Sequence, residues 1–338
     1  MDTMGCMSVP IPLTDQHGRT ATDLRVSLTD RCNLRCSYCM PAEGLAWQPI
    51  EEQLTNAELL RLMDIAVRRL GIRTIRLTGG EPLLRKDLVP LVTDMAQLEP
   101  RPKLALTSNG IGLDRRAEEL AAAGLDRINI SLDTLDRDRF KALTRRDRLH
   151  SVLAGVEAAV GTGLNPVKIN TVPMRGVNDH DLVALVQWAM ETGVHLRFIE
   201  QMPLDAQHGW SREQMVTADE VQRELSTAFR LTPVPGRGSA PAERFQIDDG
   251  PHEVGIIASV TRPFCGACDR VRLTADGQIR NCLFARTESD LRAPLRAGAT
   301  EDQIVQQWLA AVASKLPGHG INDPSFLQPD RPMSAIGG

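Results

Sequence analysis

Residues 24–41, with the sequence LRVSLTDRCNLRCSYCMP, decide the fold. Residues 24–28 have the short, apolar-rich composition of a β-strand, and Cys32, Cys36 and Cys39 follow it within one short loop. In parallel α/β sheets, ligands bind beyond the carboxyl ends of the strands. This stretch therefore predicts three thiols presented together over the mouth of a sheet.

The chain repeats this strand-first pattern up to about residue 200. Short β-type runs alternate with longer amphipathic runs, which is typical of a parallel sheet built from βα units. We expect strands at residues 24–28, 74–78, 103–107, 127–132, 167–172 and 195–199, and helices at residues 55–70, 87–97, 113–123, 151–161 and 179–192. Six units are too few for a closed eight-stranded barrel, so we predict an α/β fold with an incomplete (β/α)6 TIM-like barrel. A doubly wound open sheet is the alternative.

Polar residues gather where these expected strands end. They occupy positions 78–81, 107–109, 131, 133, 170 and 200–202. Any one of them is explained by ordinary turn and cap chemistry, but several ends marked in the same way favour a binding site at that rim of the sheet.

The pattern changes in the last third of the chain. Residues 201–211 interrupt it, and residues 231–251 are rich in proline and glycine, which indicates irregular or hairpin structure. We place a boundary near residue 230, between a barrel region at 1–230 and a smaller α+β region at 231–338 that closes the barrel mouth. Helices are expected at residues 288–297 and 300–314, whereas the tail at 322–338 has too much proline, glycine and serine for a regular element.

The composition excludes several classes of protein. With 338 residues, 42% of them hydrophobic, the chain can bury a sizeable core, and its net charge of −4 gives no overall attraction to nucleic acid or to an anionic membrane. No apolar run approaches the roughly 18 residues needed to cross a bilayer, and the N-terminus lacks the pattern of a signal peptide. We therefore expect a cytoplasmic protein that binds neither nucleic acid nor membrane.

Six of the seven cysteines form two groups, and Cys6 alone stands apart. A secreted disulfide scaffold would be shorter and denser in cysteine, so grouped thiols in a reducing compartment indicate metal or redox chemistry. The group Cys32-x3-Cys36-x2-Cys39 can ligate three irons of a [4Fe–4S] cluster and leave the fourth iron open. Structural zinc is the alternative, but zinc prefers four protein ligands, often in C-x2-C pairs.

The second group, Cys265-x2-Cys268-x13-Cys282, again offers three ligands. On spacing alone, a zinc ribbon completed by His252 or by Cys6 competes here with a second iron–sulfur cluster. The residues between Cys268 and Cys282 therefore bear on the choice.

Arg270 and Arg272 lie within the second group, just after Cys268. They lie two residues apart, so in an extended strand their side chains share one face. The planar guanidinium group fits phosphate oxygens. Beside a cluster with an open ligand position, this pair indicates an anionic substrate.

The first cysteine group resembles the signature of the radical S-adenosylmethionine (SAM) superfamily, because an aromatic residue, Tyr38, precedes its last cysteine. The run Gly79-Gly80-Glu81-Pro82 resembles that superfamily's motif for the amino-acid end of SAM. The resemblance implies that the open iron binds the amino and carboxylate groups of SAM. One electron from the cluster then cleaves SAM to methionine and a 5′-deoxyadenosyl radical.

Almost the whole chain, from about residue 18 onward, is similar to the GTP 3′,8-cyclase family within that superfamily. The matching stretches are residues 29–41, 75–85, 169–179, 198–203, 264–284 and 333–338. The resemblance implies two [4Fe–4S] clusters, SAM, and a lyase-class reaction that converts GTP to (8S)-3′,8-cyclo-7,8-dihydroguanosine 5′-triphosphate. In that reaction the adenosyl radical removes the 3′ hydrogen of the ribose and the carbon radical attacks C8 of guanine. This is the first step of molybdenum cofactor (molybdopterin) biosynthesis.

The resemblance also implies a role for each matched residue. The cluster ligands are Cys32, Cys36 and Cys39 for the first cluster and Cys265, Cys268 and Cys282 for the second. The SAM contacts are Tyr38, Gly80, Ser131 and Met202. The GTP contacts are Arg25, Arg76, Thr107, Lys168, Arg270, Val271 and Arg272. The catalytic residues are Arg25, Arg270, Arg272, Gly337 and Gly338. The two glycines are included because the diglycine end reaches into the active-site cavity in the family.

Two positions depart from the family's pattern. Ser108 stands where a second threonine is frequent, and Asp269 stands where asparagine is common, so that Asp269 could reposition Arg270. The family further implies an electron donor of the flavodoxin or ferredoxin type and a downstream cyclic pyranopterin monophosphate synthase, and a monomer or a homodimer would fit.

Two other functions remain open at this point. In the first, the SAM cluster is kept and the second cluster carries electrons during peptide or protein modification. In the second, the chain is a zinc-stabilised nucleotide-binding or regulatory module with no enzymatic activity.

Overall fold

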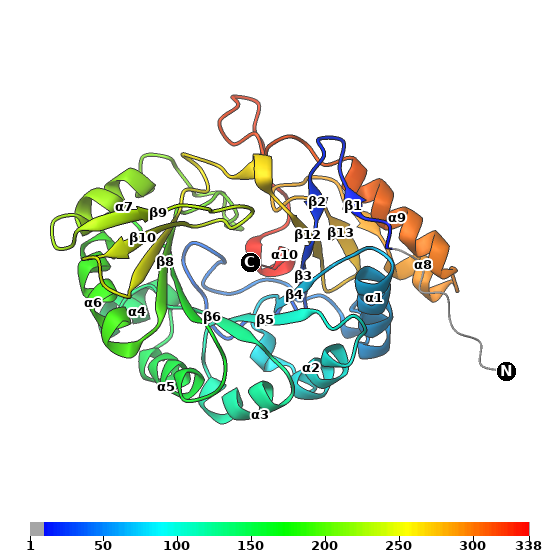
Figure 1. The fold of residues 1–338 in the computed structure, drawn as a ribbon, viewed down its shortest axis with the longest axis horizontal. Coiled ribbons are helices and arrows are strands. Elements are labelled where there is room, and N and C mark those ends of the chain that lie inside the picture. The colour runs from blue at the N-terminus through cyan, green and yellow to red at the C-terminus, as the bar shows by residue number, and fades with distance from the viewer. Residues whose placement is uncertain (1–9, 338) are drawn as a thin grey trace.

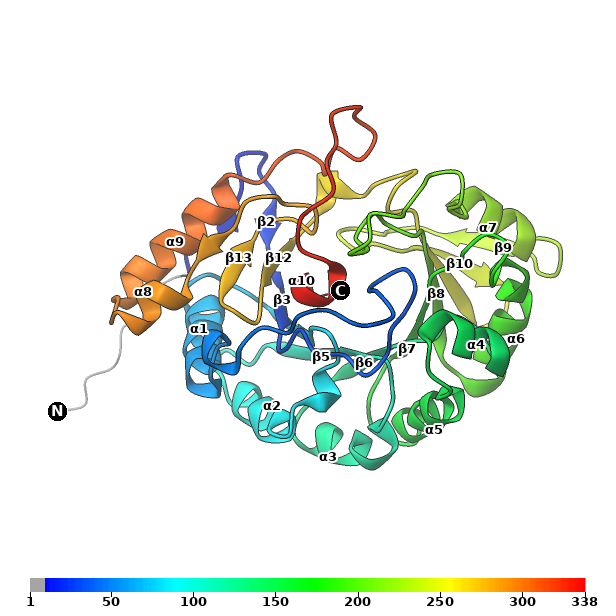
Figure 2. The same ribbon diagram turned by 180° about the vertical axis from the view of Figure 1, so that it is seen from behind.

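The chain curves one large sheet into an open ring (Figure 1). The structure, a computed structural model, describes residues 10–337. Helices cover the outside of the ring, and the last helix of the chain lies inside it, as the views from both sides show (Figures 1 and 2). The interior of the ring is therefore the place where distant parts of the sequence meet.

Six parallel strands form the central part of the sheet. They are β3 (Asp23–Ser27), β4 (Thr74–Thr78), β5 (Lys103–Ser108), β6 (Arg127–Ser131), β7 (Val167–Thr171) and β8 (His195–Ile199). The strands predicted from the sequence are confirmed, and their ends differ from the prediction by one residue at most.

Helices fill the crossovers between these strands. They are α1 (Asn56–Arg68), α2 (Leu88–Ala96), α3 (Ala117–Ala122), α4 (Arg137–Thr144), α5 (Leu149–Val160) and α6 (Leu182–Thr192). Short 3-10 turns lie at η1 (Ile50–Glu52), η2 (Pro82–Leu84), η3 (Leu113–Arg115) and η4 (Asp179–Asp181). The helix expected at residues 113–123 is divided into η3 and α3, and the one expected at 179–192 begins as η4.

Helix α4 was not predicted. It begins where the Asp136 side chain accepts a hydrogen bond from the Arg139 backbone N–H, which is an ordinary N-cap. Its buried side chains are only Phe140, Leu143 and Thr144, so the helix is too short to show the apolar period on which the prediction depended.

Alternation along the strands separates an apolar outer face from a polar inner face. In β4, Ile75 and Leu77 are completely buried in the hydrophobic core, whereas Arg76 and Thr78 line a cavity inside the ring. In β3, Leu24 and Val26 belong to the same core and Arg25 lines the cavity. The core therefore lies between sheet and helices, and the interior of the ring is left to polar groups.

The C-terminal third extends this same sheet at both edges. Its strands are β9 (Leu231–Val234), β10 (Glu243–Ile247), β11 (Glu253–Ile257), β12 (Arg270–Leu273), β13 (Gln278–Arg280) and β14 (Ser289–Asp290). Strand β11 pairs in parallel with β8, and β12 pairs in parallel with β3. The full order is β14-β13-β12-β3-β4-β5-β6-β7-β8-β11-β10-β9, and a separate hairpin joins β1 (Leu13–Thr14) to β2 (Thr20–Ala21).

The remaining helices are α7 (Ala218–Leu225), α8 (Arg292–Arg296), α9 (Glu301–Ala313) and α10 (Met333–Ile336), with the 3-10 turn η5 (Cys265–Ala267). The helix expected at 300–314 is confirmed as α9. The one expected at 288–297 was wrong in its first part, because the short strand β14 precedes α8. The tail was also predicted wrongly, since it contains α10.

The architecture is an incomplete TIM-like barrel, as expected. Within residues 10–337 the end strands β14 and β9 do not pair with each other, so the ring stays open. The boundary placed near residue 230 stays a prediction, and strands from both sides of it share the sheet. In the described part of the chain, no helix is long and apolar enough to span a bilayer.

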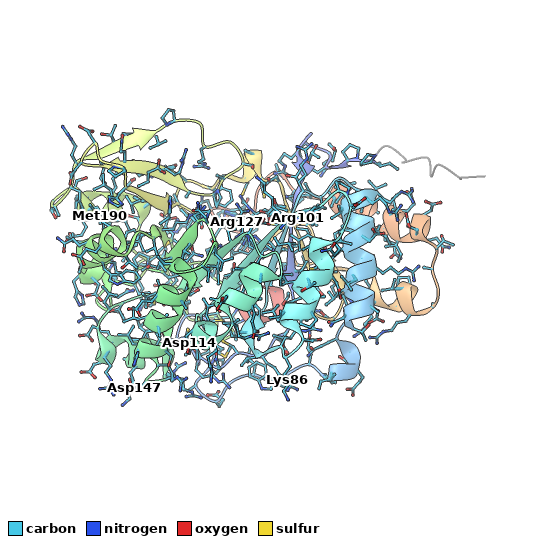
Figure 3. All side chains as sticks on the ribbon, turned by 60° about the horizontal axis from the view of Figure 1, so that its bottom comes forward. Lys86, Arg101, Asp114, Arg127, Asp147 and Met190 are labelled. Atoms are coloured by element: carbon cyan, nitrogen blue, oxygen red, sulfur yellow. The ribbon has the colours of Figure 1, made fainter. Side chains whose placement is uncertain are left out.

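The side-chain view separates the two ends of the strands (Figure 3). Arg101 and Arg127, which lie before or at the start of β5 and β6, appear toward one edge of the molecule. Lys86, Asp114 and Asp147, which follow the ends of β4, β5 and β6, lie toward the opposite edge. The parallel strands therefore run from the first edge to the second.

Candidate active site

A cavity of about 780 Å³ occupies the interior of the ring. Small-molecule sites commonly have volumes of about 300–1,000 Å³. The cavity extends along the whole length of the strands, from Asp23 and Arg127 at the starts of β3 and β6 to Ser131 and Asn170 near the ends of β6 and β7. It is therefore long enough to present different chemistry at its two ends.

The polar residues expected at the strand ends line this cavity, except Glu200 and Gln201. Glu200 is only 3% exposed, and its carboxylate accepts hydrogen bonds from the backbone N–H groups of Ala218, Val260 and Thr261. It therefore holds the start of α7 against the loop after β11 and takes no part in lining the cavity.

Both cysteine triplets line the same cavity. Cys32, Cys36 and Cys39 lie in the loop after β3, and Cys265, Cys268 and Cys282 flank β12 and β13. All six are free thiols, so neither triplet is joined by disulfides. The sequence predicted each triplet separately, and the tertiary structure brings the two together.

The register of β12 separates the triplets along the cavity. Arg270 pairs with Asp23, the first residue of β3, so Cys268 lies near the start of that strand. Cys32 lies beyond its other end. Five strand residues span about 16 Å. The two triplets therefore lie toward opposite ends of the cavity, and the side chains of β3 lie between them.

The first triplet is held by backbone hydrogen bonds in a tight loop. The N–H groups of Cys39 and Met40 both donate to the Cys36 carbonyl, at 2.9 and 3.0 Å. Burial raises the pKa of Cys32 to about 11 and that of Cys39 to about 12, and it raises the pKa of Cys36 well above its usual range. Neighbouring thiols add to the shifts of Cys36 and Cys39. The thiolates that iron needs therefore form only when metal ions supply positive charge.

Gly79 and Gly80 let the end of β4 pass against the cysteine loop. A Cβ at Gly80 would lie 2.3 Å from the Arg31 carbonyl oxygen, and one at Gly79 would lie 2.3 Å from that of Thr29. The Gly80 N–H donates to the Thr29 carbonyl at 2.6 Å. Only glycine fits this close approach of two backbones.

Glu81 joins three segments beneath the cysteine loop. It is 1% exposed, and its carboxylate accepts hydrogen bonds from the Ser108 hydroxyl and from the backbone N–H groups of Asn109 and Leu83. Burial raises its pKa to about 7. Ser108, one of the two departures from the family's pattern, therefore keeps the hydroxyl group that a threonine would have, and this hydroxyl binds Glu81.

Tyr38 points away from solvent toward the end of β6. Its hydroxyl donates to the Asp133 carboxylate at 2.8 Å, and Asp133 also accepts from the Val172 N–H at 2.9 Å. Asp133 thereby fixes the position of Tyr38, a function that the sequence did not assign to it. Ser131 and Met202 line the cavity together with Tyr38.

The second triplet is tied to the N-terminal hairpin and to the end of α9. Arg19 donates to the Cys265 carbonyl at 2.7 Å. Burial raises the pKa of Cys265, and the neighbouring thiols of Cys282 and Cys268 raise it further. Burial also acts to raise the pKa of Cys268, but the positive charges of Lys315 and Arg270 outweigh it and hold that pKa below its usual value.

The two triplets fit iron–sulfur clusters by the chemistry of their donors. Within residues 10–337, no group of three His, Cys, Asp or Glu side chains could hold one metal ion. A [4Fe–4S] cluster does not need three side chains that converge on one metal ion, because each thiolate binds a different iron of the cluster. Three thiols that face one cavity and influence one another's pKa fit such a cluster.

Three arginines form a row between the triplets. Arg272 of β12 pairs in register with Arg25 of β3, which pairs with Arg76 of β4, and all three line the cavity. In the described residues the row has one ion pair with a carboxylate, between Arg76 Nη2 and Asp23 Oδ2 at 3.6 Å. The Nε groups of Arg25 and Arg76 are buried without a hydrogen-bond partner.

Burial of these positively charged guanidinium groups costs free energy, and a bound anion would reduce that cost. Burial lowers the pKa of Arg25 well below its usual range, and Arg272 and Arg76 lower it further. Burial likewise lowers the pKa of Arg272 to about 10. Arginine stays protonated in proteins, so these shifts report unfavourable burial of charge. The row therefore favours a ligand with several negative charges.

Further cations lie near the strand starts. Two expected GTP contacts line the cavity, namely Lys168 near the start of β7 and the uncharged Thr107 near the end of β5. Sequence reasoning missed Arg127 of β6 and Arg197 of β8, which also line it. Alternation along each strand was the available signal, since Arg127 lies two residues before Asn129 on the inner face.

Val271 is placed differently from the other expected GTP contacts. Its side chain is 1% exposed and belongs to the hydrophobic core, on the opposite face of β12 from Arg270 and Arg272. This follows from the alternation of a strand. Any contact of Val271 with a ligand in the cavity is therefore left to its backbone.

The C-terminal tail enters the ring and contacts the arginine row. The Gly337 carbonyl accepts a hydrogen bond from Arg272. Gly337 has a φ of +86°, and a Cβ there would lie 2.8 Å from Thr78 Cγ2. Gly338, the second glycine of the predicted pair, lies outside the described residues.

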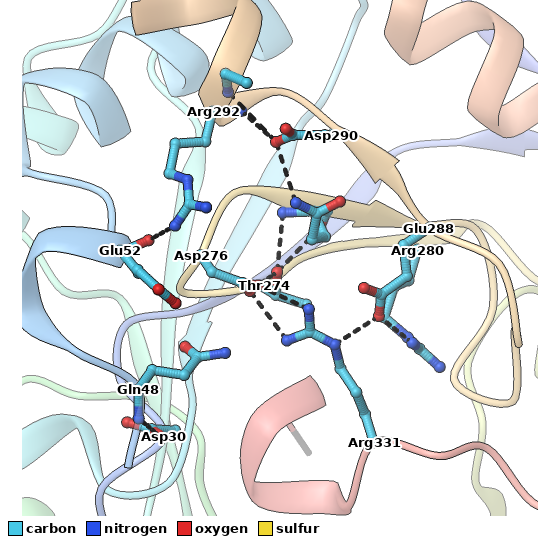
Figure 4. Close-up of polar contacts among 12 residues, drawn as sticks. Asp30, Gln48, Glu52, Thr274, Asp276, Arg280, Glu288, Asp290, Arg292 and Arg331 are labelled. Atoms are coloured by element: carbon cyan, nitrogen blue, oxygen red, sulfur yellow. Dashed lines mark hydrogen bonds and ion pairs between the residues drawn. The ribbon is translucent and has the colours of Figure 1, made fainter.

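Ion pairs hold this tail against the β12–β13 hairpin (Figure 4). Arg331 donates to both carboxylate oxygens of Asp276, at 3.0 and 2.7 Å, and its Nε lies 2.8 Å from Glu288 Oε1. Glu288 also pairs with the buried Arg280. Sequence reasoning missed this network because Arg331 lies 55 residues beyond Asp276 along the chain.

Asp269, the second departure from the family's pattern, ties the loop between β9 and β10 to the cavity wall. Its carboxylate accepts hydrogen bonds from the hydroxyls of Ser239, at 2.9 Å, and Thr22, at 3.2 Å. Arg270 in turn donates to the Ser239 carbonyl at 2.5 Å. Asp269 therefore influences the position of Arg270 directly, through an ion pair between Arg270 Nη2 and Asp269 Oδ1 at 3.9 Å, and also through Ser239.

The zinc alternatives required two further residues. Cys6 lies outside the described residues. His252 lies in the turn between β10 and β11, and it is not among the described residues that line the cavity.

Comparison with known proteins agrees with these features. The radical SAM superfamily model matches residues 26–189, and the Molybdenum Cofactor Synthesis C model matches residues 194–321. The GTP 3′,8-cyclase of Streptomyces coelicolor is 62% identical over 328 residues, covering 96% of this chain and 96% of that protein. Those of Mycolicibacterium smegmatis and Corynebacterium glutamicum strain R are 58% and 57% identical, covering 97% and 96% of this chain and 92% and 89% of theirs.

Solved structures support the fold. SuiB of Streptococcus suis bound to its precursor peptide SuiA has a TM-score of 0.60 at 14% identity, covering 90% of this chain and 67% of that one. A second SuiB structure has a TM-score of 0.59 at 13% identity, covering 94% and 77%. At this identity the likeness concerns the fold alone.

Replacing Gly337 with Ala is expected to displace the tail. The new Cβ would clash with Thr78, and overpacking of this kind costs about 1–3 kcal/mol. In hydrogen exchange, the Gly337 N–H, which donates to Met333, should exchange roughly tenfold to a hundredfold faster than in the parent protein. Gly320→Ala is the matched control, because Gly320 also has a positive φ (+70°) but a Cβ there would meet no atom within 4 Å. Equal tail exchange in the two variants would contradict the packing role of Gly337.

Proposed function

The chain belongs to the GTP 3′,8-cyclase family of radical SAM enzymes, and we propose that its cavity holds SAM at the first cysteine triplet and GTP between the two triplets. It converts GTP to (8S)-3′,8-cyclo-7,8-dihydroguanosine 5′-triphosphate, the first step of molybdenum cofactor biosynthesis. Its cofactors are SAM and two [4Fe–4S] clusters.

One observation carries the assignment of the cavity. Two thiol triplets line a single cavity, and between them lies a row of three guanidinium groups that has one carboxylate partner in the described residues. GTP has about four negative charges at neutral pH and is the anionic ligand that such a row favours. When bound, the first cluster and SAM supply the 5′-deoxyadenosyl radical that starts the reaction.

The residues at the first end of the cavity bind and orient SAM. Cys32, Cys36 and Cys39 hold the first cluster, and Gly80 brings a strand end close to it. Tyr38 is fixed by Asp133, which supports a role as one wall of the SAM site. Ser131 and Met202 complete that wall.

The residues between the triplets bind GTP. Cys265, Cys268 and Cys282 hold the second cluster at the guanine end of the substrate. Arg25, Arg76, Arg270 and Arg272, with Lys168 and Thr107, contact the substrate, and their charges counter those of the triphosphate. Arg127 and Arg197 add positive charge to the same region. No general base is required of the chain in this assignment.

The tail positions one of these groups. Gly337 accepts a hydrogen bond from Arg272, so the tail fixes the direction of that guanidinium group while leaving its other N–H groups for substrate. Gly338 extends the tail by one residue. Arg331 and Asp276 anchor the segment that carries both glycines.

The partners follow from the chemistry. We infer that the electron comes from a protein of the flavodoxin or ferredoxin type and that the product passes to a cyclic pyranopterin monophosphate synthase. We also infer a cytoplasmic location, because clusters with open irons need a reducing compartment. A monomer and a homodimer are both compatible with a site built within one chain.

The proposed reaction can be tested directly. After anaerobic reconstitution with iron and sulfide, the protein should contain about eight irons per chain, as two four-iron clusters require. Addition of SAM, GTP and dithionite should yield 5′-deoxyadenosine and the cyclised nucleotide, detected by liquid chromatography and mass spectrometry. A preparation with that iron content that forms neither compound would refute the function.

Replacing Arg270 or Arg272 with Ala should weaken GTP binding by roughly 10- to 100-fold, because each change removes a hydrogen bond to a charged group worth about 1.5–3 kcal/mol. Cleavage of SAM without GTP should stay measurable, since these residues lie away from the first triplet. Arg137→Ala removes an equal charge from an exposed ion pair with Asp147 and should leave GTP affinity unchanged. Unaltered affinity in both cavity variants would show that the arginines do not contact the nucleotide.

Binding of GTP should take up a proton through Lys168. Burial and, after it, the charges of Arg197, Arg127, Arg76 and Arg244 together lower the pKa of Lys168 to about 7, so the amine loses its charge as the pH rises above about 7. A bound triphosphate favours the charged form and raises that pKa again. Calorimetric titrations at pH 8 in buffers of different ionisation enthalpy should therefore show net proton uptake in the parent protein and less in Lys168→Met. Equal uptake in both proteins would assign the proton to another group.

A further inference from the structure

A buried lysine reaches the second cysteine triplet. Lys315 lies just after α9, is 4% exposed, and is not among the described residues that line the cavity. Its ammonium group lies 3.4 Å from the Cys268 sulfur, 3.4 Å from the Cys268 carbonyl oxygen and 2.8 Å from the Arg270 carbonyl oxygen. The sulfur is thus one of the three acceptors that surround the three N–H groups.

Burial of this charge calls for an anion. Within residues 10–337, Lys315 forms no ion pair with a carboxylate, and its acceptors are those three atoms of Cys268 and Arg270. An ammonium group taken out of water without an opposite charge costs several kcal/mol. The group beside it that can supply a negative charge is the Cys268 sulfur, 3.4 Å away, once that sulfur binds a cluster as a thiolate.

A cluster at this triplet would meet the need of Lys315. An iron–sulfur cube held by three thiolates is anionic, and it becomes more so when it accepts an electron. Hydrogen bonds and positive charge at the ligand sulfurs stabilise the reduced form and raise the reduction potential. The arrangement therefore affects the redox chemistry of the second cluster and not only the packing of α9.

We propose that Lys315 is a positioning residue that holds Cys268 as a cluster ligand and raises the reduction potential of the second cluster by donating a hydrogen bond to its sulfur. The inference rests on the proposed function in one respect, namely that the second triplet binds a cluster. One electron passes to the cluster from the external donor, the proton stays on Lys315, and no covalent bond forms or breaks.

Lys315 also bonds two backbone carbonyls, so a purely structural role must be distinguished. In that case its replacement would loosen the chain whether or not a cluster is present. In the proposed role, the metal-free protein contains an unfavourable buried charge. Removal of that charge should leave the metal-free fold at least as stable as before.

The test uses full-length protein with both clusters reconstituted. The second-cluster signal is identified in electron paramagnetic resonance by its change on addition of GTP, and its midpoint potential is measured by anaerobic titration with dithionite. Lys315→Met should lower the equilibrium constant for reduction about tenfold, which is about 59 mV for a one-electron couple. Lys315→Gln, which keeps a donor without the charge, should give an intermediate shift, and Lys315→Arg should restore a potential near that of the parent.

Lys103→Met is the matched control. Lys103 is exposed at the start of β5, so the substitution changes the net charge equally without contact to either triplet. Its second-cluster potential should equal that of the parent. A second measurement compares metal-free Lys315→Met with the metal-free parent in thermal unfolding, where the variant should be at least as stable.

The outcomes separate this inference from the proposed function. An unshifted potential in Lys315→Met with about eight irons bound would overturn the role of Lys315 and leave the function intact. Folded Lys315→Met that keeps about four irons would support the role in holding Cys268. A less stable metal-free variant with an unshifted potential would identify a structural role only. A parent protein without a second cluster would overturn both.

Discussion

Buried like charge is the constraint on which the rest of this structure depends. Arg272, Arg25 and Arg76 lie side by side on adjacent strands, and in the described residues one carboxylate, that of Asp23, forms an ion pair in this row, with Arg76. The thiols at the first end of the cavity are held neutral by burial until metal ions bind. The metal-free, ligand-free cavity therefore has an excess of positive charge, and anionic clusters and an anionic nucleotide both reduce it. Cofactor binding, substrate binding and stability are linked through this one balance.

The sheet fixes the order in which the two triplets and the arginine row follow one another along the cavity. Because strands alternate, each inner-facing side chain has a fixed depth, and parallel register sets the depth of its neighbours. The first triplet follows the end of β3 and the second flanks the start of β12, with the arginine row at a level between them. A molecule that spans the row is within reach of both triplets. The GTP 3′,8-cyclase reaction needs this geometry, since the radical must form near the ribose while the base is held elsewhere.

The C-terminal third supplies what the six central βα units lack. Strand β12 adds Arg272 to the row, Lys315 contacts the second triplet, and Gly337 brings the tail to Arg272. The last of these contacts has a long-range anchor, the Arg331–Asp276 ion pair. Such partly buried ion pairs keep a segment rich in proline and glycine in one place, where its own propensities would leave it irregular.

Local patterns in the sequence were enough to determine the six central strands, most of the helices between them, both cysteine triplets and the glycine pair after β4. These features depend on residues a few positions apart, so spacing and alternation specify them. The sequence alone did not reveal that β12 pairs with β3, that Arg272 stands beside Arg25, that Asp133 holds Tyr38, or that Lys315 contacts Cys268. Those contacts join residues from about 47 to 250 positions apart. Only the packed tertiary structure decided them, because the pairing of distant segments follows from the burial and register of the whole sheet and leaves no local pattern in the chain.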